Sequence, residues 1–468
     1  MHILSKSTYI KGLQCEKALY MTKKHPYLRD KLSIEQRAKF QRGSDVGVLA
    51  HQCFPGGVNM TPNSPSQFPK KVKETLENLA NPDVNVMYEA VFQYNETLIM
   101  VDLMVRVGEQ WKAIEVKSSL RLSPTYYNDA ALQYYVLKGC QVPLADFLLM
   151  HLNPDYERHG DIEVDKLFLC VSVLDYAESK QEWVAANVER LKQVVGLPHS
   201  PLVRIGTHCH DPYTCDFLGH CWKNVPKNSF LYTTALPDEQ LFEYYFGGIG
   251  TNEELLRQLD PNDEEAHQIE ALESNSYYVD YKTLYALTPQ PKPKSVAYLN
   301  LLLYRPAVPE LEGTRPYQEM ILAFAIKGEY EPEGCFVWDC LGDHSRWHEG
   351  IGIMTEKLSH YEQLVCFTPM DIASTLMRHE VLQNREIGYK VFNLFEVLAQ
   401  ACFYHPAIKS GFSLQHVAEA VFPGSKLFEH SRILMEALGF ELTSYEQAKN
   451  DLLTENEYVE KLYQHFVK

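Results

Sequence analysis

The stretch Ile99–Ser118, IMVDLMVRVGEQWKAIEVKS, decides the fold of the first part of the chain. Apolar and polar residues alternate around Asp102, a turn signal follows at Gly108–Glu109, and the next seven residues are rich in β-formers. This pattern predicts a two-stranded hairpin. Glu115 and Lys117 are two residues apart, so they point to the same face of the second strand. In a closed hairpin, Asp102 reaches that face as well.

The hairpin therefore brings two carboxylates and an ammonium group to one end of a small sheet. Two close carboxylates repel each other unless a cation lies between them, and hard divalent cations prefer oxygen ligands. The pattern predicts a divalent cation site. The alternative is a surface hairpin with solvated charges, which is the common explanation for an isolated Glu-x-Lys.

The composition is that of a globular protein. A chain of 468 residues is long enough for two or three domains, and it is 45% apolar and 22% charged. No stretch approaches the roughly 18 apolar residues of a membrane span, and the first residues lack the apolar core of a signal peptide. We expect a cytoplasmic protein with no membrane partner. Its 11 cysteines then serve metal binding, catalysis or burial rather than disulfides.

The net charge of −17 is unevenly distributed. Residues 1–225 hold 25 basic and 25 acidic residues, so the whole excess of acid lies in the second half. Within the first half, residues 1–42 carry 10 basic and 3 acidic residues. A basic segment beside a carboxylate site suits a polyanionic substrate. The alternative is a solvated helical surface, and charge alone does not separate the two.

Helices are predicted on both sides of the hairpin. Residues 5–24 and 33–53 show helical spacing, and the second helix places Gly43, Gly47 and His51 on one face. A glycine costs about 1 kcal/mol in a helix interior. Two glycines on one face predict close approach to another element, with His51 at the end. Residues 124–139 begin with proline and end with glycine, which indicates a helix.

Residues 206–222 form a loop with three regularly spaced cysteines, Cys209, Cys215 and Cys221. Regular spacing in a loop indicates metal ligands in a protein without disulfides. Zinc and iron–sulfur clusters take four ligands, so a fourth must come from elsewhere, and Cys15 is a candidate. The alternative is three free thiols.

The second half begins with a helical connector over residues 226–290, which ends in a Pro-rich linker. A second α/β domain follows over residues 291–468. Its predicted strands are 296–304, 321–326 and 335–339, and its predicted helices are 355–365, 369–382, 392–403, 413–421, 428–437 and 444–465.

Residues 1–225 resemble the PD-(D/E)XK nucleases of the RecB type, in the branch that holds a four-cysteine iron–sulfur cluster. That branch includes the CRISPR spacer-acquisition exonucleases and the nuclease domains of AddAB-type helicase–nucleases. The matching pieces occur in the order of the family: Cys15, the glycine-rich helix ending in His51, Asp102, Glu115 to Lys117, Gln133 with Tyr135, and the three late cysteines.

The resemblance implies a restriction-endonuclease-like mixed sheet flanked by helices. His51, Asp102, Glu115 and the carbonyl group of Val116 would hold Mg²⁺ or Mn²⁺, and Lys117 would orient or activate the attacking water. The other implied roles are substrate positioning by Gln133 and Tyr135, and a structural 4Fe–4S cluster, with zinc as the alternative, on Cys15, Cys209, Cys215 and Cys221. Glu89 could be a further acid.

The second half resembles the DEDD 3′–5′ exonucleases, which have an RNase H-like fold. Asn300, Leu302 and Asn393 stand where the metal-binding acids of that family occur, whereas the GTRPYQ motif of residues 313–318 matches. The resemblance therefore implies a catalytically inactive domain. The alternative is activity through other acids, namely Asp339, Asp343 or Glu396.

The resemblance of residues 1–225 implies a metal-dependent DNA nuclease, most simply an exonuclease, acting in DNA repair, recombination or defence against foreign DNA. Its partners would be single-stranded DNA or duplex ends, and a protein for the acidic C-terminal domain. The alternative is a non-catalytic factor that keeps the nuclease fold and binds nucleic acid or protein.

Overall fold

The hairpin predicted for residues 99–118 is present in the computed structural model. Strands β4 (Thr97–Val107) and β5 (Gln110–Lys117) are antiparallel, paired from Val107 and Gln110 to Leu103 and Ile114. Gly108 supplies the positive φ of 62° that the turn requires. The predicted hairpin is confirmed. The structure describes residues 3–32, 34–234, 236–331, 334–369, 371–374, 391–425, 427 and 442–467.

The chain divides into two compact units. Unit 1 contains Met1–Asn224 and Pro306–Gln318, and unit 2 contains Val225–Arg305 and Glu319–Lys468. The segment Pro306–Gln318 thus belongs to unit 1, although the sequence pattern assigns it to the second domain. Each unit is a mixed sheet flanked by helices, so the predicted α/β fold class is confirmed.

Unit 1 is built on a seven-stranded sheet of order β2-β3-β4-β5-β6-β7, in which β1 also pairs with β4. Its other strands are β1 (Leu4–Ser5), β2 (Val58–Asn59), β3 (Val86–Tyr94), β6 (Leu144–Leu152) and β7 (Phe168–Ser172). Its helices are α1 (Lys6–Gln14), α2 (Glu16–Lys24), α3 (Ile34–Ala50), α4 (Phe68–Ala80), α5 (Pro124–Gly139), α6 (Val164–Leu167), α7 (Leu174–Ser179), α8 (Gln181–Gly196) and α9 (Leu218–Cys221).

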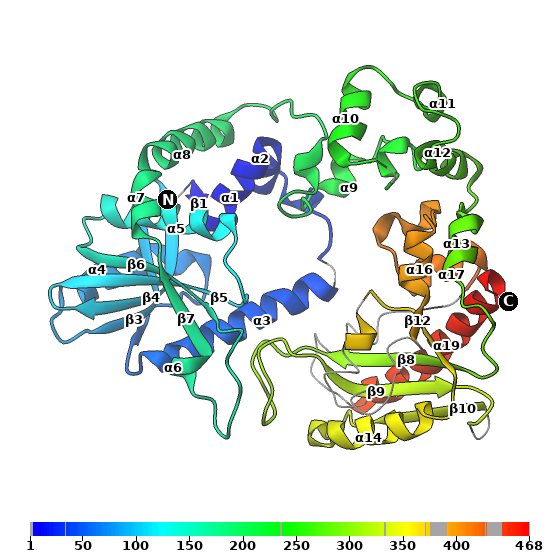
Figure 1. Cartoon of the computed structure of the whole chain (residues 1–468). Helices are drawn as coiled ribbons and strands as arrows, with labels where there is room; N and C mark the ends of the chain where they lie inside the picture. The colour runs from blue at the N-terminus through cyan, green and yellow to red at the C-terminus, as the bar shows by residue number, and fades with distance from the viewer. Residues whose placement is uncertain are drawn as a thin grey trace. The chain divides into compact units, whose positions relative to one another are not determined.

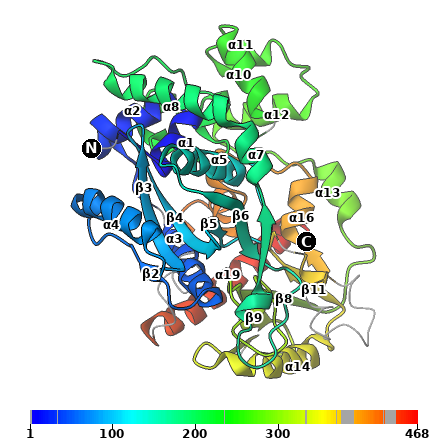
Figure 2. The same cartoon turned by 90° about the vertical axis from the view of Figure 1, so that its left-hand side faces the viewer.

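Helices cover both faces of this sheet, which is why its strands are apolar on both sides. Helix α5 lies over one face, backed by α1 and α8, and α3 crosses the other face (Figure 1). Helix α4 packs beside β3 toward one edge of the sheet (Figure 2). The site described below lies at the end of β5, between α5 and the start of α1.

Unit 2 is built on a five-stranded sheet of order β10-β9-β8-β11-β12. Its strands are β8 (Val296–Tyr304), β9 (Met320–Lys327), β10 (Cys335–Asp339), β11 (Gln363–Cys366) and β12 (Val391–Asn393). Its helices are α10 (Asp238–Phe246), α11 (Asn252–Leu256), α12 (Glu264–Ser274), α13 (Tyr281–Leu287), α14 (Trp347–Leu358), α16 (Leu394–Gln400), α17 (Leu414–Val421) and α19 (Leu442–Phe466).

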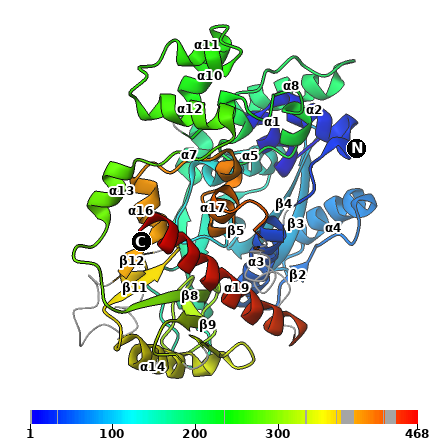
Figure 3. The ribbon, with the colours of Figure 1, turned by 90° about the vertical axis from the view of Figure 1, so that its right-hand side faces the viewer.

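The long helix α19 crosses one face of this sheet, over β8 and β9 (Figure 3). Asn456 on α19 donates to the carbonyl groups of Tyr298 and Ala325, at 3.0 and 3.1 Å. Helix α14 packs on the other face, where Gly350 leaves room for the ring of Trp338 on β10. The core of unit 2 is therefore sandwiched between helices, as in unit 1.

The structure corrects several predicted elements. The predicted helix 5–24 is broken at Cys15, which is extended (φ −157°, ψ 116°) and separates α1 from α2. The predicted helix 355–365 is wrong, because α14 ends at Leu358 and the strand β11 begins at Gln363. The predicted helix 428–437 and most of 369–382 lie outside the described residues.

Within the described ranges, no helix combines the length and the apolar character that crossing a membrane requires.

Candidate active site

The site forms where two neighbouring strands part. The ladder between β4 and β5 stops at the pair Leu103 and Ile114, so Asp102 and Glu115 are the first residues beyond it. Further along β4, the short strand β1 pairs with Thr97–Leu98 instead. Asp102 Oδ2 accepts a hydrogen bond of 2.6 Å from the backbone N–H of Val116. The structure thus brings Asp102 to the end of β5, next to Glu115.

Glu115 is the centre of the site, and its side chain is only 2% exposed. Its Oε1 accepts from Lys117 Nζ at 2.8 Å and from Lys6 Nζ at 2.6 Å. Its Oε2 accepts from Gln133 Nε2 at 2.7 Å. A buried carboxylate is stable only when it is paired and hydrogen-bonded, and Glu115 has both kinds of partner. Gln133 therefore joins the site, with Glu115 and Lys117.

Lys117 has a second acidic partner that the sequence pattern did not identify. Its Nζ lies 2.8 Å from Asp129 Oδ2 on α5 and 4.8 Å from the ring centre of Tyr126. Burial acts to lower the pKa of Lys117, but Glu115 and Asp129 outweigh it and raise the pKa. Lys117 is therefore held as an ammonium group in a fixed position. Asp129 lies one helical turn before Gln133 on α5, so both face the same side of the helix. This spacing in the sequence could have identified Asp129 as a residue of the site.

Lys6 is also a residue that the sequence analysis missed. It follows directly after β1, so the pairing of β1 with β4 delivers its ammonium group to Glu115. Burial acts to lower the pKa of Lys6, but Glu115 and Asp102 outweigh it and raise the pKa. In the sequence, only the basic character of residues 1–42 pointed to Lys6. That character is shared by all the basic residues of the segment, so it could not single out Lys6.

The acids of the site influence one another. Burial, and after it the charge of Glu115, raise the pKa values of both Asp102 and Glu89. Burial also acts to raise the pKa of Glu115, but Lys117 and Lys6 lower it overall. Of these acids, Glu115 is the one that carries its charge most firmly, because it has two ammonium partners.

Glu89 joins this cluster through an unusual backbone conformation. Its φ of 54° is in the left-handed region, which is uncommon for a residue other than glycine or asparagine. It lies between the pairs Tyr88–Leu103 and Ala90–Val101, and so opposite Asp102. Strain of this kind costs roughly 1–3 kcal/mol and persists where the surroundings enforce it. The structure thus places the suggested further acid beside the other two.

His51 lies just past the end of α3, at the start of a short 3₁₀ helix (His51–Cys53). Its ring stacks on Tyr88, with centroids 4.1 Å apart and planes 4° apart. Its Nε2 is among the buried polar atoms of the described residues that have no hydrogen-bond partner. Burial lowers the pKa of His51, which favours the neutral imidazole that binds metals.

The glycines of α3 do not face a closely packed neighbour. A Cβ atom on Gly47 would meet nothing within 4 Å, and one on Gly43 would only reach Ser118 Oγ at 4.0 Å. The predicted close approach is therefore wrong at Gly47. Gly43 instead faces Ser118, just after the end of β5, and Gly47 faces open space.

Tyr135 lies away from Glu115. Its hydroxyl group accepts a hydrogen bond of 2.9 Å from Asn95 Nδ2, in the turn between β3 and β4, and its ring packs against Tyr94. Gln133 and Tyr135 are about 200° apart around α5, so they face different neighbours. The structure brings Gln133 to the site and places Tyr135 beside the β3–β4 turn, where it does not contact Glu115.

The predicted ligands fit a divalent cation in their chemistry, because Mg²⁺ and Mn²⁺ accept a neutral imidazole, two carboxylates and the Val116 carbonyl group. Among the described residues, however, His51 contacts Tyr88 rather than Asp102 or Glu115, and its Nε2 has no hydrogen-bond partner. Glu115, however, is held here by two lysines. In the part of the chain that the structure describes, no three His, Cys, Asp or Glu side chains are arranged as a metal site.

The four predicted cluster ligands line one pocket. Cys15 comes from the break between α1 and α2, and Cys209, Cys215 and Cys221 come from the loop around α9. Ala18, Met21 and Phe217 pack against Cys15, Cys215 and Cys221. Burial raises the pKa of Cys215 to about 11, and it also raises the pKa values of Cys15 and Cys221. Thiols are the ligands that zinc and iron–sulfur clusters take, although within the described residues these four line a pocket without being arranged as a metal site.

His208 also lines this pocket and was missed by the sequence analysis. Its Nε2 lies 4.0 Å from Cys209 Sγ. It is next to Cys209 in the sequence, so its proximity follows from the backbone and does not make it a ligand.

In unit 2, the residues at the expected acid positions make other contacts. Asn300 donates to Glu455 at 2.5 Å, Asn393 bonds the backbone of Thr368, and Leu302 is buried. The alternative acids are separately engaged: Asp339 pairs with Lys449 at 3.0 Å, and Asp343 caps the turn at Ser345. Glu396 lies in the first turn of α16.

Comparison with known proteins adds little to this geometry. No protein-family model and no curated protein matches the chain. A solved structure described as "Crystal structure of SSO0001" is 14% identical and covers 37% of this chain and 74% of that chain, with a TM-score of 0.16. A similarity of this size carries no argument about fold or function.

Proposed function

We propose that the protein is a metal-dependent DNA nuclease that hydrolyses phosphodiester bonds, most simply as an exonuclease. The observation that carries the proposal is the cluster at the end of β5, where Asp102, Glu115 and Lys117 converge with Gln133. A bound Mg²⁺ or Mn²⁺ would supply an activated water and neutralise charge on the phosphate. DNA repair, recombination or defence against foreign DNA would be its setting.

The chain's own residues have distinct roles in this proposal. His51, Asp102, Glu115 and the Val116 carbonyl group hold the metal, with Glu89 as a further acid. Lys117, fixed by Glu115 and Asp129, orients the attacking water and stabilises charge on the phosphate. Gln133 fixes the Glu115 carboxylate through Oε2. Tyr135 would affect substrate positioning indirectly, by ordering the β3–β4 turn through Asn95 and Tyr94.

The remaining parts have supporting roles. We propose that Cys15, Cys209, Cys215 and Cys221 hold a structural 4Fe–4S cluster, or zinc, which joins distant parts of unit 1. Metal binding of this kind contributes directly to folding free energy. Unit 2 is proposed to be an inactive RNase H-like domain, because Asn300 and Asn393 cannot replace carboxylates as ligands of two metals. Its acidic surface suits a protein partner better than DNA.

The direct test is DNA degradation by the purified full-length protein. We expect end-labelled single-stranded or duplex DNA to be shortened when Mn²⁺ or Mg²⁺ is present in large excess over the protein, because sites of one or two carboxylates bind such ions weakly, and EDTA should stop the reaction. If no single-stranded, blunt or overhanging substrate is degraded with either metal, the nuclease proposal fails.

One observation favours a second function, a non-catalytic binding factor. Both oxygens of Glu115 are already bonded, to Lys6, Lys117 and Gln133. Such a site could persist as a structural ion-pair network. Calorimetry with Mn²⁺ separates the two proposals: a nuclease binds the ion, and Glu115→Gln abolishes this binding. A binding factor takes up DNA without any metal dependence.

Lys6 should compete with the metal for Glu115. We expect Lys6→Met to raise Mn²⁺ affinity by about tenfold, because a positive charge beside the ligands is removed. Lys6→Arg keeps the charge and is the matched control, with an affinity near that of the wild type. Calorimetric titration measures both variants. Equal affinities for Lys6→Met and Lys6→Arg would mean that Lys6 does not oppose metal binding.

A further inference from the structure

The segment Pro306–Gln318, called the arm below, is the part of unit 1 that the sequence does not suggest. The arm lies in the sequence between β8 and β9, which are both strands of unit 2, yet the arm itself belongs to unit 1. An ion pair between Arg305 and Glu319 joins its two ends. A hairpin connection usually needs two to five residues, so an excursion of this length calls for an explanation.

The arm is fastened to the loop between β6 and α6 by its backbone. Arg158 N donates to Thr314 O at 3.0 Å, and Gly313 N donates to Arg158 O at 2.8 Å. The guanidinium group of Arg158 also donates to the carbonyl oxygens of Pro309 and Glu310, at 3.1 and 2.6 Å. These bonds fix the tip of the arm in one register.

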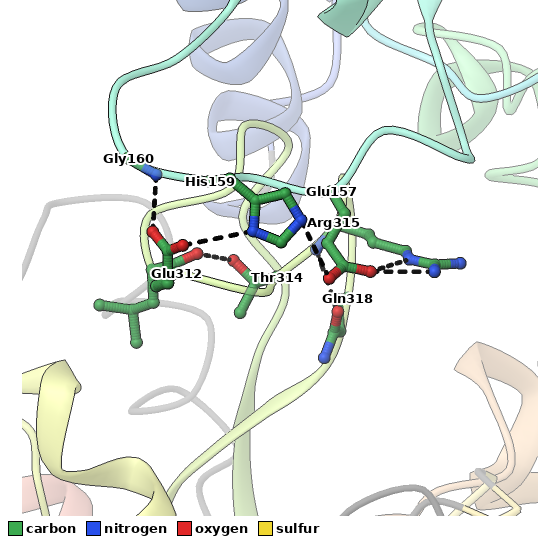
Figure 4. Close-up of polar contacts among 8 residues, drawn as sticks. Glu157, His159, Gly160, Glu312, Thr314, Arg315 and Gln318 are labelled. Atoms are coloured by element: carbon green, nitrogen blue, oxygen red, sulfur yellow. Dashed lines mark hydrogen bonds and ion pairs between the residues drawn. The ribbon is translucent and has the colours of Figure 1, made fainter.

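Side chains on both sides of the tip reinforce this register (Figure 4). Glu312 accepts from the backbone N–H of Gly160 at 2.6 Å and lies 3.3 Å from His159 Nδ1. Arg315 pairs with Glu157 at 3.0 Å on the other side. Exposed pairs contribute little individually, but together they specify where the arm docks.

The base of the arm packs into the core under α3. Ala307, which is 7% exposed, belongs to the same apolar cluster as Val46 and Ala50 of α3 and Ile114 of β5, and Tyr317 packs against that cluster. The arm therefore contributes to the hydrophobic core of unit 1 and is not merely a surface loop.

Tyr317 connects the arm to the site. Its hydroxyl group donates to the carbonyl oxygen of Ser118, the residue directly after Lys117. Arg42 of α3 and Tyr126 act electrostatically on that hydroxyl group, and the ring of Tyr126 lies 4.8 Å from the Lys117 ammonium group. Tyr317 adopts a φ of 56°, and strain at a bulky residue indicates that its position is enforced by its contacts.

We infer that Tyr317 is a positioning residue that holds the end of β5, and through it Lys117, in the arrangement that hydrolysis requires. The inference rests on the proposed nuclease function for its catalytic consequence. The docking itself does not depend on that function. The chain that continues from both ends of the arm is unit 2, so an active site in unit 1 needs a segment carried between two strands of unit 2.

The test compares full-length Tyr317→Phe with Tyr285→Phe. The first change keeps the ring and removes the hydrogen bond to Ser118. The second removes a hydroxyl group from a 71% exposed tyrosine on α13. Hydrogen exchange of peptides covering residues 114–121, followed by mass spectrometry, reports whether the end of β5 loosens. We expect roughly fivefold faster exchange there in Tyr317→Phe and no change in Tyr285→Phe.

Steady-state nuclease assays provide the second measurement. We expect kcat of Tyr317→Phe to fall by roughly tenfold with KM for DNA unchanged, because Lys117 is misplaced while binding is kept. Unchanged exchange at residues 114–121 overturns the inference, whatever the activity. Faster exchange with unchanged kcat, in a wild-type enzyme that is active, overturns the positioning role. Faster exchange in a protein that never degrades DNA supports the docking and fails the proposed function instead.

Discussion

Lys117→Met and Asp102→Asn are each expected to reduce DNA hydrolysis by roughly 10²–10⁴-fold. Methionine keeps the unbranched stem of the lysine side chain but removes the ammonium group that faces Glu115 and Asp129. Asparagine keeps the shape of Asp102 but donates as readily as it accepts, which weakens both metal binding and the bond from Val116 N. Single-turnover degradation of end-labelled DNA with saturating protein measures the effect.

Matched variants are available on the same part of the fold. Lys112→Met lies on β5 but faces away from Lys117, since the two are an odd number of residues apart. Asp83→Asn removes an exposed carboxylate before β3. Both controls should keep near wild-type rates. Activity that survives in Lys117→Met and Asp102→Asn would move the reaction to another part of the chain.

Cys15→Ser is expected to destabilise the protein by about 5 kcal/mol, from the loop-closure entropy of joining residues nearly two hundred positions apart. For a unit of this size, that corresponds to a fall in Tm of roughly 10–20 °C. The physical reason is that Cys15 is the one proposed ligand from the N-terminal helices, whereas the other three proposed ligands share a loop. Calorimetric scanning measures Tm, and visible absorbance with metal analysis identifies the bound group.

Cys170→Ser is the control, because Cys170 is exposed on β7 and lies outside the pocket. It should leave both Tm and metal content unchanged. A brown wild-type protein that bleaches in Cys15→Ser indicates the iron–sulfur cluster, and a colourless one with stoichiometric zinc indicates the zinc site. A metal-free wild-type protein whose Tm is the same as that of Cys15→Ser would contradict any metal on these cysteines.

The elements around the site were predictable because their signals are local. Alternation and a Gly-Glu turn set the β4–β5 hairpin, and the bounds of α5 follow from Pro124 at its start and Gly139 at its end. The helix predicted at 355–365 failed because a short apolar run has no clear period. Residues 363–366 are buried between β8 and β12, and that environment favours a strand.

The site was only partly predictable, for a different reason. Asp102, Glu115 and Lys117 lie close together in the sequence, so strand geometry alone relates them. Lys6 reaches Glu115 only because β1 pairs with β4, and Tyr317 reaches Ser118 only because the arm docks in unit 1. Contacts between residues that are far apart in the sequence leave no pattern in either segment, so hydrophobic periodicity cannot predict them.

The docked arm also sets the order in which the protein can be completed on the ribosome. Domains generally fold as they emerge, at about 5–20 residues per second. Unit 1 must wait for Gln318 after Asn224 has been synthesised, which takes roughly 5–20 s at that speed. During this interval the nascent chain exposes apolar surface that Ala307 and Tyr317 later cover. Newly made unit 1 is thus expected to be most prone to aggregation before residues 306–318 have been synthesised.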